Sequence, residues 1–426
     1  MSIVNPLQKL MELYPNGTGP DNTWDYDGIF WNIHLTWDMV EDYMQKNPGK
    51  RIPWVYVGSV IPWNVIRDNY GRIINEEGKE KEIPWDFRDI CQRKDVTWDI
   101  LQNELLPLLK NYAVYHIQIQ YFSSGNPNIT DEIVLNNPKY NWDYYTLSTN
   151  KNISSELILA KYPKHVYRNP NMKWKDAKKL IPMYMGNDND SRDFWFWLSS
   201  HPCVTWKIIK KNLYFRCRDG VKRVPWMWDV ISYNPNLEPE NVFETMNVIK
   251  DTPRKKRLYF NTCMDHDTIE DLIISPDGKY SHYIPWNTYW FYNLKGLTWE
   301  NIVKHKCYSN GEEFPWNWKT YSRYVPFDWI QKSAIKAEDG TYTFAVPWNW
   351  KQVSFNFNIT PEILTDNLQG KHGFIIPWDW KMVSLNSRMT WEFIHDTLQG
   401  KYDFTIPWNF KCLSDNFFGV MPSLFY

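Results

Sequence analysis

Tryptophan recurs in this chain at a nearly fixed interval. Of the 26 tryptophans, five in the C-terminal part follow one another at gaps of 30, 32, 30 and 30 residues, from Trp286 to Trp408. Nearly the same interval separates Trp24, Trp54 and Trp85 near the N-terminus, and Trp195 from Trp226. A fixed period of this length is typical of proteins built from stacked repeats. A residue that recurs once per unit is most simply a packing residue, so we assign most of these indoles to the core.

The clearest unit, residues 377–406, predicts a pair of short helices. Pro377 suits the first position of the first helix, where a backbone N–H is not needed. Thr390 is a plausible N-cap for the second helix, whose apolar stripe begins at Trp391. Gly400 then suits a helix stop, because glycine tolerates a left-handed backbone. By the same reasoning we expect helices to end at Gly49, Gly78, Gly220, Gly278, Gly311, Gly340 and Gly370.

A pair of short helices cannot hold together alone, but stacked pairs bury both faces. We therefore predict an all-α fold, an α-solenoid of about 13–14 helix-turn-helix repeats of ~30 residues. We expect residues 1–23 to form an N-terminal cap, 24–416 a continuous solenoid, and 417–426 an apolar C-terminal cap. The tryptophans that we expect to be structural residues of the repeat are Trp226, Trp286, Trp316, Trp348, Trp378, Trp391 and Trp408.

Three recurring motifs carry a resemblance to a known family. They are Pro-Trp-Asp/Asn-Trp, as at 377–380, the Asn-Pro-Asn-Ile-Thr turn at 126–130, and Trp-Glu-x-Ile at 391–394. In these features the chain resembles the tryptophan-repeat proteins of large double-stranded DNA viruses, found among insect poxviruses, mimiviruses and their relatives. The resemblance covers roughly residues 24–416 and is most specific in about the last 150. It implies a viral origin and a repeat fold more than a mechanism.

The formal net charge is −1, so no overall field attracts nucleic acid or anionic lipid. Charge is uneven, however: residues 161–223 hold fifteen basic and five acidic side chains, a net +10 that leaves −11 for the rest. In a solenoid these charges would form a central basic stripe, suited to an acidic or phosphorylated protein or to nucleic acid. The alternative is that they solvate an exposed helix face. The residues that we expect to bind a partner are Lys207, Lys210, Lys211, Arg216, Arg218, Lys222 and Arg223.

Motifs for catalysis, metals or cofactors do not stand out. The six cysteines are scattered, and the two His-x-Cys pairs, 201/203 and 305/307, lie too far apart to converge. Gly-Lys recurs only in the stops between helices and is no phosphate loop. The run 187–193 holds Asp and Asn side chains that would suit Ca²⁺, but a solvated loop is the simpler interpretation. We expect no catalytic residues, no metal and no cofactor.

The leading functional hypothesis is a non-enzymatic repeat scaffold that mediates protein–protein interaction, of viral origin. A structural, virion-associated protein and a nucleic-acid-binding module that uses the basic stripe remain alternatives. No stretch approaches the ~18 apolar residues of a membrane span, and the first residues lack a secretory pattern. We therefore expect an intracellular protein, in the host cytoplasm or the virion, without membrane contact. The partner, the oligomeric state and the binding face stay open.

Overall fold

The structure is a computed structural model that describes residues 5–109, 113–186, 188–217, 220–231, 234, 236, 298–304 and 316–418. The chain divides into two compact units. Unit 1 joins Met1–Ile90 with Asn317–Tyr426, and unit 2 is Cys91–Trp316. Most of the regular structure is helical, and the strands of the described residues all lie in two-stranded hairpins.

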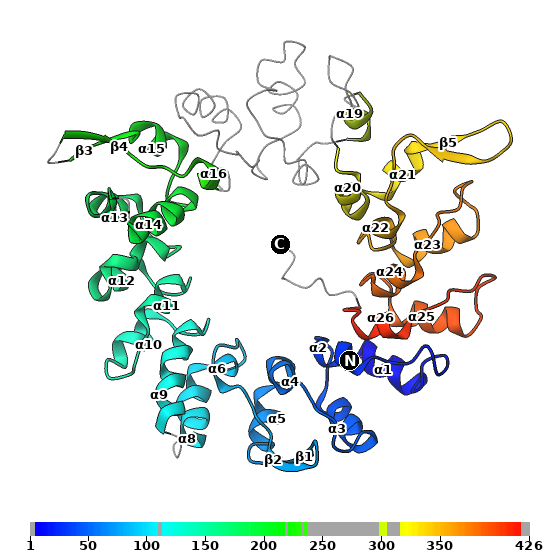
Figure 1. The fold of residues 1–426 in the computed structure, drawn as a ribbon, viewed down its shortest axis with the longest axis horizontal. Coiled ribbons are helices and arrows are strands. Elements are labelled where there is room, and N and C mark those ends of the chain that lie inside the picture. The colour runs from blue at the N-terminus through cyan, green and yellow to red at the C-terminus, as the bar shows by residue number, and fades with distance from the viewer. Residues whose placement is uncertain are drawn as a thin grey trace. The chain divides into compact units, whose positions relative to one another are not determined.

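Two kinds of helix alternate in unit 1. An A helix begins at or soon after a tryptophan of the Pro-Trp type, and a B helix follows across a turn. The A helices are α2 (Tyr26–Trp31), α4 (Trp54–Val60), α6 (Phe87–Ile90), α20 (Trp318–Tyr324), α22 (Trp350–Ser354), α24 (Trp380–Leu385) and α26 (Phe410–Ser414). The B helices are α3 (Trp37–Lys46), α5 (Trp63–Asp68), α21 (Phe327–Ser333), α23 (Pro361–Leu368) and α25 (Trp391–Leu398). Successive A helices pack on one another, α20 on α22, α22 on α24 and α24 on α26 (Figure 1).

Unit 2 follows the same plan less regularly, with tight 3-10 turns and one π-turn among its helices. Its helical elements are α7 (Trp98–Ile100), η1 (Leu101–Leu105), α8 (Leu106–Leu108), α9 (Ala113–Phe122), η2 (Ser123–Gly125), α10 (Asp131–Asn136), α11 (Tyr144–Thr149), α12 (Ser155–Lys161), η3 (Pro163–Arg168), α13 (Trp174–Leu180), η4 (Ile181–Tyr184), α14 (Asn189–Ser200), α15 (Trp206–Lys211), α16 (Trp228–Ile231) and α19 (Trp299–Lys304). Here α14 is the A helix that packs against α16, and α15 is a B helix.

The A helices begin later than the sequence predicts. Pro377 lies outside α24, which starts at Trp380, so its assignment to the first helical position is wrong. The proline and Trp378 instead form a tight turn, in which the Trp378 N–H donates to the Ile376 carbonyl at 2.9 Å. The carboxylate of Asp379 then caps the helix by accepting from the Met382 N–H at 3.1 Å. The acidic or amide residue between the two tryptophans of the motif is therefore the N-cap.

The B helices begin where the sequence predicts. Thr390 precedes α25, and its side chain accepts a hydrogen bond from the Phe393 N–H at 3.2 Å. Thr360 caps α23 in the same way, with Pro361 at the first helical position. Gly400, with φ of 69°, follows the end of α25 in a left-handed conformation. Both the start and the stop signal predicted for this helix are confirmed.

Three of the expected helix stops belong to β-hairpins instead, so the described part of the chain is helix-rich with three hairpins and not all-α. Gly78 and Gly340 lie between paired strands, and Gly220 is the first residue of a strand, paired with Cys217. At the first hairpin, Glu77 (φ 54°) and Gly78 (φ 75°) are both left-handed, which matches the twist of a hairpin turn. Each hairpin follows a B helix: β1 (Ile73–Glu76) and β2 (Lys79–Glu82), β3 (Tyr214–Cys217) and β4 (Gly220–Arg223), and β5 (Ala334–Lys336) and β6 (Tyr342–Phe344).

Tryptophans of the Pro-Trp type are buried at each described position, with exposed fractions of 2% to 9%. Several indole N–H groups also close the preceding B helix: Trp378 Nε1 donates to Asn367 Oδ1 at 3.0 Å, and Trp408 Nε1 to Thr397 Oγ1 at 2.7 Å. Of the tryptophans that we named as structural residues, Trp391 is half-buried and Trp286 lies outside the described residues. The others are buried, namely Trp226, Trp316, Trp348, Trp378 and Trp408.

After several of the described A helices, a buried asparagine in the turn ties the repeat to the one before it. Asn386, which is 1% exposed, donates from Nδ2 to the carbonyl oxygens of Ser354 at 3.2 Å and Asn356 at 3.0 Å. Asn416 repeats the pattern one unit later, on Ser384 at 2.6 Å and Asn386 at 3.1 Å. These bonds satisfy carbonyl groups at the ends of the A helices, which would otherwise be buried without a partner. We call this series the asparagine ladder.

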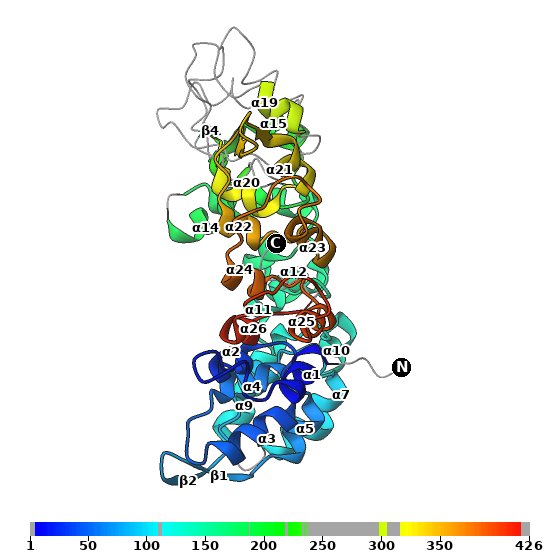
Figure 2. The ribbon, with the colours of Figure 1, turned by 90° about the vertical axis from the view of Figure 1, so that its right-hand side faces the viewer.

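The chain's N-terminal segment continues the asparagine ladder after residue 416. Asn32 donates to the carbonyl oxygens of Ser414 at 2.8 Å and Asn416 at 2.9 Å, and the Asp25 N–H donates to Ser414 Oγ at 2.9 Å. In both views α2 lies beside α26, and α1 (Pro6–Leu13) lies beside α25 (Figures 1 and 2). We call the contact of residues 5–34 with residues 391–418 the seam.

The seam involves both regions that the sequence analysis assigned to caps. Residues 5–23, expected as an N-terminal cap, supply α1, whose Leu7 and Leu10 are fully buried. Of the expected C-terminal cap, 417–426, the structure describes Phe417 and Phe418. The Phe417 carbonyl oxygen lies 2.9 Å from His34 Nε2, so it too contacts the N-terminal segment.

Candidate interaction surface

Helix α15 presents its lysines to solvent because its apolar side faces the core. Trp206 (7% exposed) and Ile209 (1% exposed) lie three residues apart on the inner side. Lys207, Lys210 and Lys211 lie between and after them and are exposed. The last two also stand in the final turn of the helix, where a positive charge is favourable next to the free carbonyl groups.

The β3–β4 hairpin extends this basic surface beyond the helix. Its register pairs Tyr214 with Arg223 and Arg216 with Val221, so these four side chains share one face. Tyr214 is 64% exposed and Val221 is 67% exposed, and both arginines are exposed. Lys222 is exposed on the hairpin's opposite face. One side of the hairpin therefore offers guanidinium groups beside an aromatic ring and an apolar side chain.

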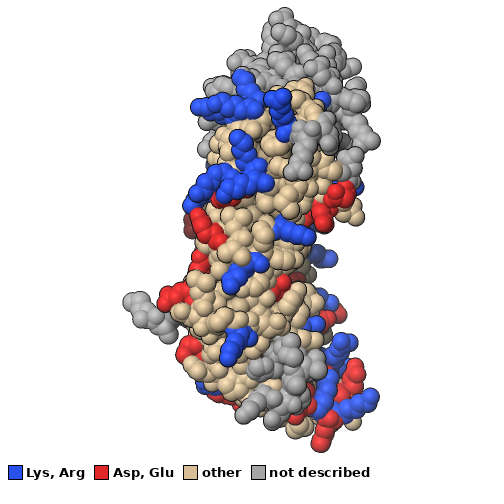
Figure 3. All heavy atoms as spheres, turned by 90° about the vertical axis from the view of Figure 1, so that its left-hand side faces the viewer, with Lys and Arg blue, Asp and Glu red and all other residues tan. Residues whose placement is uncertain are grey.

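The structure brings six of the seven predicted partner-binding residues into one stretch of unit 2. Lys and Arg side chains gather over the upper part of the face in Figure 3, on the side of α15 and the hairpin. The seventh, Arg218, lies outside the described residues. We call the exposed side of α15 and the β3–β4 hairpin the basic surface. It consists of Lys207, Lys210, Lys211, Arg216, Lys222 and Arg223.

The neighbouring B helix, α13, adds exposed lysines but also holds some of its own charge. Lys179 pairs with the buried Asp176 at 3.1 Å, and Lys173 pairs with Glu156 at 2.9 Å. Acidic residues 188, 190 and 193 stand instead on or just before α14, an A helix. These three acidic residues therefore lie on a different helix from the lysines of α13 and α15.

Those acidic residues have structural partners of their own. The Asp188 carboxylate caps α14 by accepting from the Ser191 N–H at 2.8 Å and from the Ser191 hydroxyl at 3.0 Å. The backbone bond from Ser191 is the main cause that holds the pKa of Asp188 below its usual value. Asp193 pairs with Arg168 at 2.5 Å. Capping and ion pairing thus account for two of the carboxylates that we considered for Ca²⁺.

Arg168 is a residue of this region that sequence reasoning did not single out. Its guanidinium lies 4.4 Å from the ring centre of Tyr145 and 5.5 Å from that of Trp197. Asp193 also accepts a hydrogen bond from the Tyr167 hydroxyl at 2.8 Å. Burial and this bond raise the pKa of Tyr167. Arg168 therefore links α11, η3 and α14. Its ion pair with Asp193, about one repeat further along the chain, cannot be predicted from a local sequence pattern.

His201 and Cys203, one of the two His-x-Cys pairs, belong to the asparagine ladder. His201 is 4% exposed and stands where other turns have asparagine. Its Nδ1 accepts from the Cys203 N–H at 3.0 Å, so Nε2 carries the proton and donates to the Asn169 carbonyl at 2.8 Å. Burial raises the pKa of the Cys203 thiol to about 12. The other pair, His305 and Cys307, lies outside the described residues.

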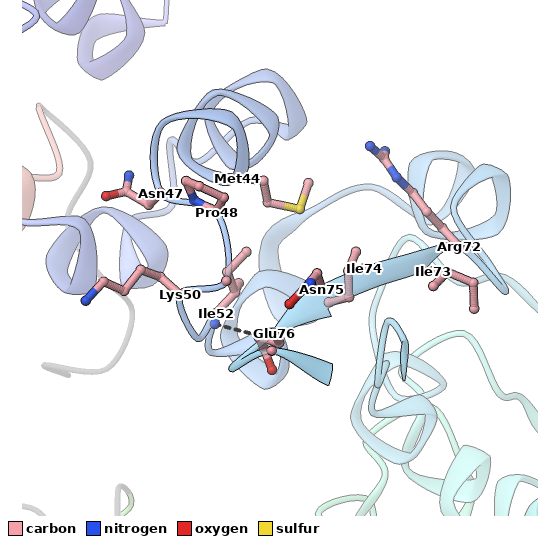
Figure 4. A pocket seen from close by; sticks show the side chains of 12 residues that line it. Met44, Asn47, Pro48, Lys50, Ile52, Arg72, Ile73, Ile74, Asn75 and Glu76 are labelled. Carbon is pink, nitrogen blue, oxygen red and sulfur yellow. Dashed lines mark hydrogen bonds between the residues drawn. The ribbon is translucent and has the colours of Figure 1, made fainter. Parts of the chain in front are cut away.

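An open pocket of about 460 Å³ lies in unit 1, between the end of α3 and the β1–β2 hairpin (Figure 4). Glu76 lines it with a carboxylate that accepts from the Ile52 N–H at 2.8 Å and from Trp54 Nε1 at 3.1 Å. Lys81 adds an ion pair at 2.5 Å. Burial alone would raise the pKa of Glu76, but the Lys81 and backbone bonds hold it below its usual value. The carboxylate therefore fixes the hairpin to the tryptophan of α4.

Among the described residues, no group of three or more His, Cys, Asp or Glu side chains is placed to hold a metal ion. None of the helices in that part of the chain is long and apolar enough to cross a membrane. In comparisons with known proteins, no family model, no curated protein and no solved structure matches this chain.

Proposed function

We propose that this chain is a non-enzymatic scaffold, an intracellular α-solenoid of viral tryptophan-repeat type, that binds a protein partner. The asparagine ladder and the buried tryptophans of the described residues support a stacked array of about 13–14 units, since they join neighbouring repeats to one another. Because these contacts lie inside, the outward side chains are free to differ from repeat to repeat. Such an array recognises partners by its surface.

The basic surface is the observation that carries the proposal. Its six cations are exposed on one B helix and one hairpin, and the nearby carboxylates of Asp188 and Asp193 are engaged at the A helix α14. Tyr and Arg side chains are enriched at protein interfaces, and the hairpin presents both on one face. A partner with an acidic or phosphorylated surface fits this combination of charge and aromatic contact.

Charge reversal tests this assignment. Lys207→Glu, Lys210→Glu and Lys211→Glu together change the basic surface by about six charges and leave Trp206 and Ile209 in place. The matched control reverses Lys351, Lys381 and Lys411, three exposed lysines of α22, α24 and α26. Each protein would be purified from infected cells and its bound partners quantified by mass spectrometry.

We expect the wild type and the control to recover a partner in stoichiometric amount. The variant with the reversed α15 should recover about tenfold less or lower still, which corresponds to a loss of ~1.4 kcal/mol in binding free energy. Equal recovery on all three proteins would show that the basic surface is not the binding site.

Nucleic acid is the second candidate, because Tyr214 is exposed beside Arg216 and Arg223 and a ring can stack on a base. Binding of a single-stranded oligonucleotide would then weaken steeply with salt. Tyr214→Ala would weaken it further at every salt concentration. Affinity that is independent of salt would reject this candidate.

A further inference from the structure

The seam joins two parts of the chain that are far apart in sequence as though they were successive repeats. Asn32 and Asn416 are 384 residues apart, yet their hydrogen bond of 2.9 Å matches the 3.0 Å between Asn386 and Asn356, which are 30 residues apart. The Asp25 N–H likewise donates to Ser414 Oγ, just as the Asn409 N–H donates to Ser384 Oγ one repeat earlier. The end of α26 therefore binds a segment with the structure of a following repeat, although this segment does not follow α26 in the sequence.

Several contacts at the seam go beyond the asparagine ladder. The Asn22 side chain donates to the Trp408 carbonyl at 2.6 Å and accepts from the Phe410 N–H at 2.8 Å. The Tyr14 hydroxyl lies 2.9 Å from His395 Nδ1 and accepts from Gln399 at 3.2 Å. The Asn22 bonds add polar specificity at the start of α26, and the Tyr14 bonds add it to the contact of α1 with α25.

The close approach of α2 to α26 restricts what can fill this place. A Cβ atom on Gly28 would lie 2.5 Å from Asp415 Oδ1 and 3.1 Å from Ser414 Cβ. The corresponding positions of α24 and α26, two residues into each helix, are Met382 and Cys412. A repeat with such side chains would not fit without a shift, so the surface selects the segment that contains Gly28.

We propose that the seam is a self-recognition site, and that a second copy of this chain binds there by placing its own residues 5–34 on α25 and α26. Each copy carries both the surface and the one segment shown to fit it, so the contacts seen within one chain can form between two. Exchange of an identical element is a low-cost route to a dimer, because no new interface is needed. The effective concentration of the chain's own segment opposes this exchange, and high protein concentration favours it.

A disulfide across the seam distinguishes a seam formed within one chain from a seam formed between two chains. Gly28→Cys and Ser414→Cys would place sulfur atoms on neighbouring Cβ positions, at a spacing slightly below that of a relaxed disulfide. Cys412 would be replaced by serine throughout, because it lies two residues from the new thiol. Asp415 would be replaced by alanine throughout, because its carboxylate would otherwise collide with a Cβ at position 28. The two single variants are mixed at high concentration and oxidised, so that a bond between positions 28 and 414 can form only between two chains. Mixing Gly58→Cys with Ser414→Cys is the control, since Gly58 faces Trp85 and Ile90.

A disulfide-linked dimer from the first mixture, but not from the control, is the expected result. The double variant on one chain should close as a monomer at low concentration. Closure in the double variant with no dimer from the mixed single variants would overturn the proposal, since the seam would then form only within a chain. No bond in either experiment would overturn it as well.

A circular permutant tests the same proposal without new thiols. Joining Tyr426 to Met1 and opening the chain between Asp339 and Gly340, in a hairpin turn, makes the two sides of the seam neighbours in sequence. The wild type, incubated in mild denaturant at high concentration and returned to buffer, should yield a dimer on size-exclusion chromatography. The permutant should yield at least tenfold less, and equal yields would overturn the proposal.

Discussion

Asn32 Nδ2 lies 2.9 Å from the carbonyl oxygen of Asn416, and Asn416 itself donates to Asn386 at 3.1 Å. The same side chain thus performs the same task on both sides of the seam. Stacking at these turns of unit 1 therefore depends on a buried amide and on the carbonyl groups that it satisfies.

Asn32→Ala should lower the free energy of unfolding by about 1–3 kcal/mol, because it leaves the carbonyl groups of Ser414 and Asn416 with one partner fewer in a buried place. Asn386→Ala, which removes the equivalent bonds to Ser354 and Asn356, is the matched variant and should cost a similar amount. Urea unfolding followed by circular dichroism measures both. A normal cost for Asn386→Ala with none for Asn32→Ala would mean that the seam does not contribute to stability.

Trp378→Ala should destabilise the protein by roughly 3–5 kcal/mol, the usual cost of truncating a buried large side chain. The indole is 8% exposed, and it also loses its bond to Asn367. Trp31, which is 56% exposed, is the control, and Trp31→Ala should cost well under half as much. Thermal unfolding by calorimetry gives both values. Equal small shifts would show that the Pro-Trp indole is not a core residue.

His201→Asn should make stability less sensitive to acid. Burial holds the pKa of His201 below its ordinary value, with the bond to Asn169 opposing the shift. The unfolded chain takes up a proton near pH 6.5 while the folded chain does not, so the free energy of unfolding falls as the pH drops below about 6.5. Asparagine removes that loss and keeps an amide in the ladder. Urea unfolding at pH 7.5 and 5.5 tests it, and identical pH dependence in both proteins would contradict the explanation.

Glu76→Gln should destabilise the protein at pH 7 by about 1–3 kcal/mol, because a charged acceptor for Ile52, Trp54 and Lys81 is replaced by a neutral one. The pKa of Glu76 is lowered in the folded state, so the carboxylate stabilises the fold above its unfolded pKa of about 4.3. That contribution is lost as the pH falls through the folded value. The difference between variant and wild type should therefore shrink below about pH 4, and a difference independent of pH would assign the effect to shape alone.

Local signals in the sequence predicted the helices better than the connections between them. Thr390 and Gly400 mark α25 because capping depends on one side chain and one backbone angle, which are visible in a single unit. The prediction of a helix stop at Gly340 is wrong because a left-handed glycine is equally suited to the end of a helix and to a hairpin turn. The Asp-Gly pair at 339–340, between residues of high strand propensity, was the signal for a hairpin.

The asparagine ladder was less visible, although its period equals that of the tryptophans. Asn356, Asn386 and Asn416 are 30 residues apart, but asparagine is common in this chain and is usually a turn residue. His201 and the ion pair of Arg168 with Asp193 depend on contacts across repeats, which no local pattern reports. The seam could not be predicted for the same reason, since no pattern in residues 5–34 indicates which distant helices they pack on.

The hairpin turns have a practical consequence for protein engineering. A Cβ placed on Gly78, Gly220 or Gly340 would meet no atom within 4 Å, so each of these glycines borders open space. The tryptophan framework begins again only at the following Pro-Trp motif. A foreign peptide loop or an affinity epitope grafted at Gly340 would consequently be displayed at the tip of β5–β6, with the helices beneath it left to fold as before.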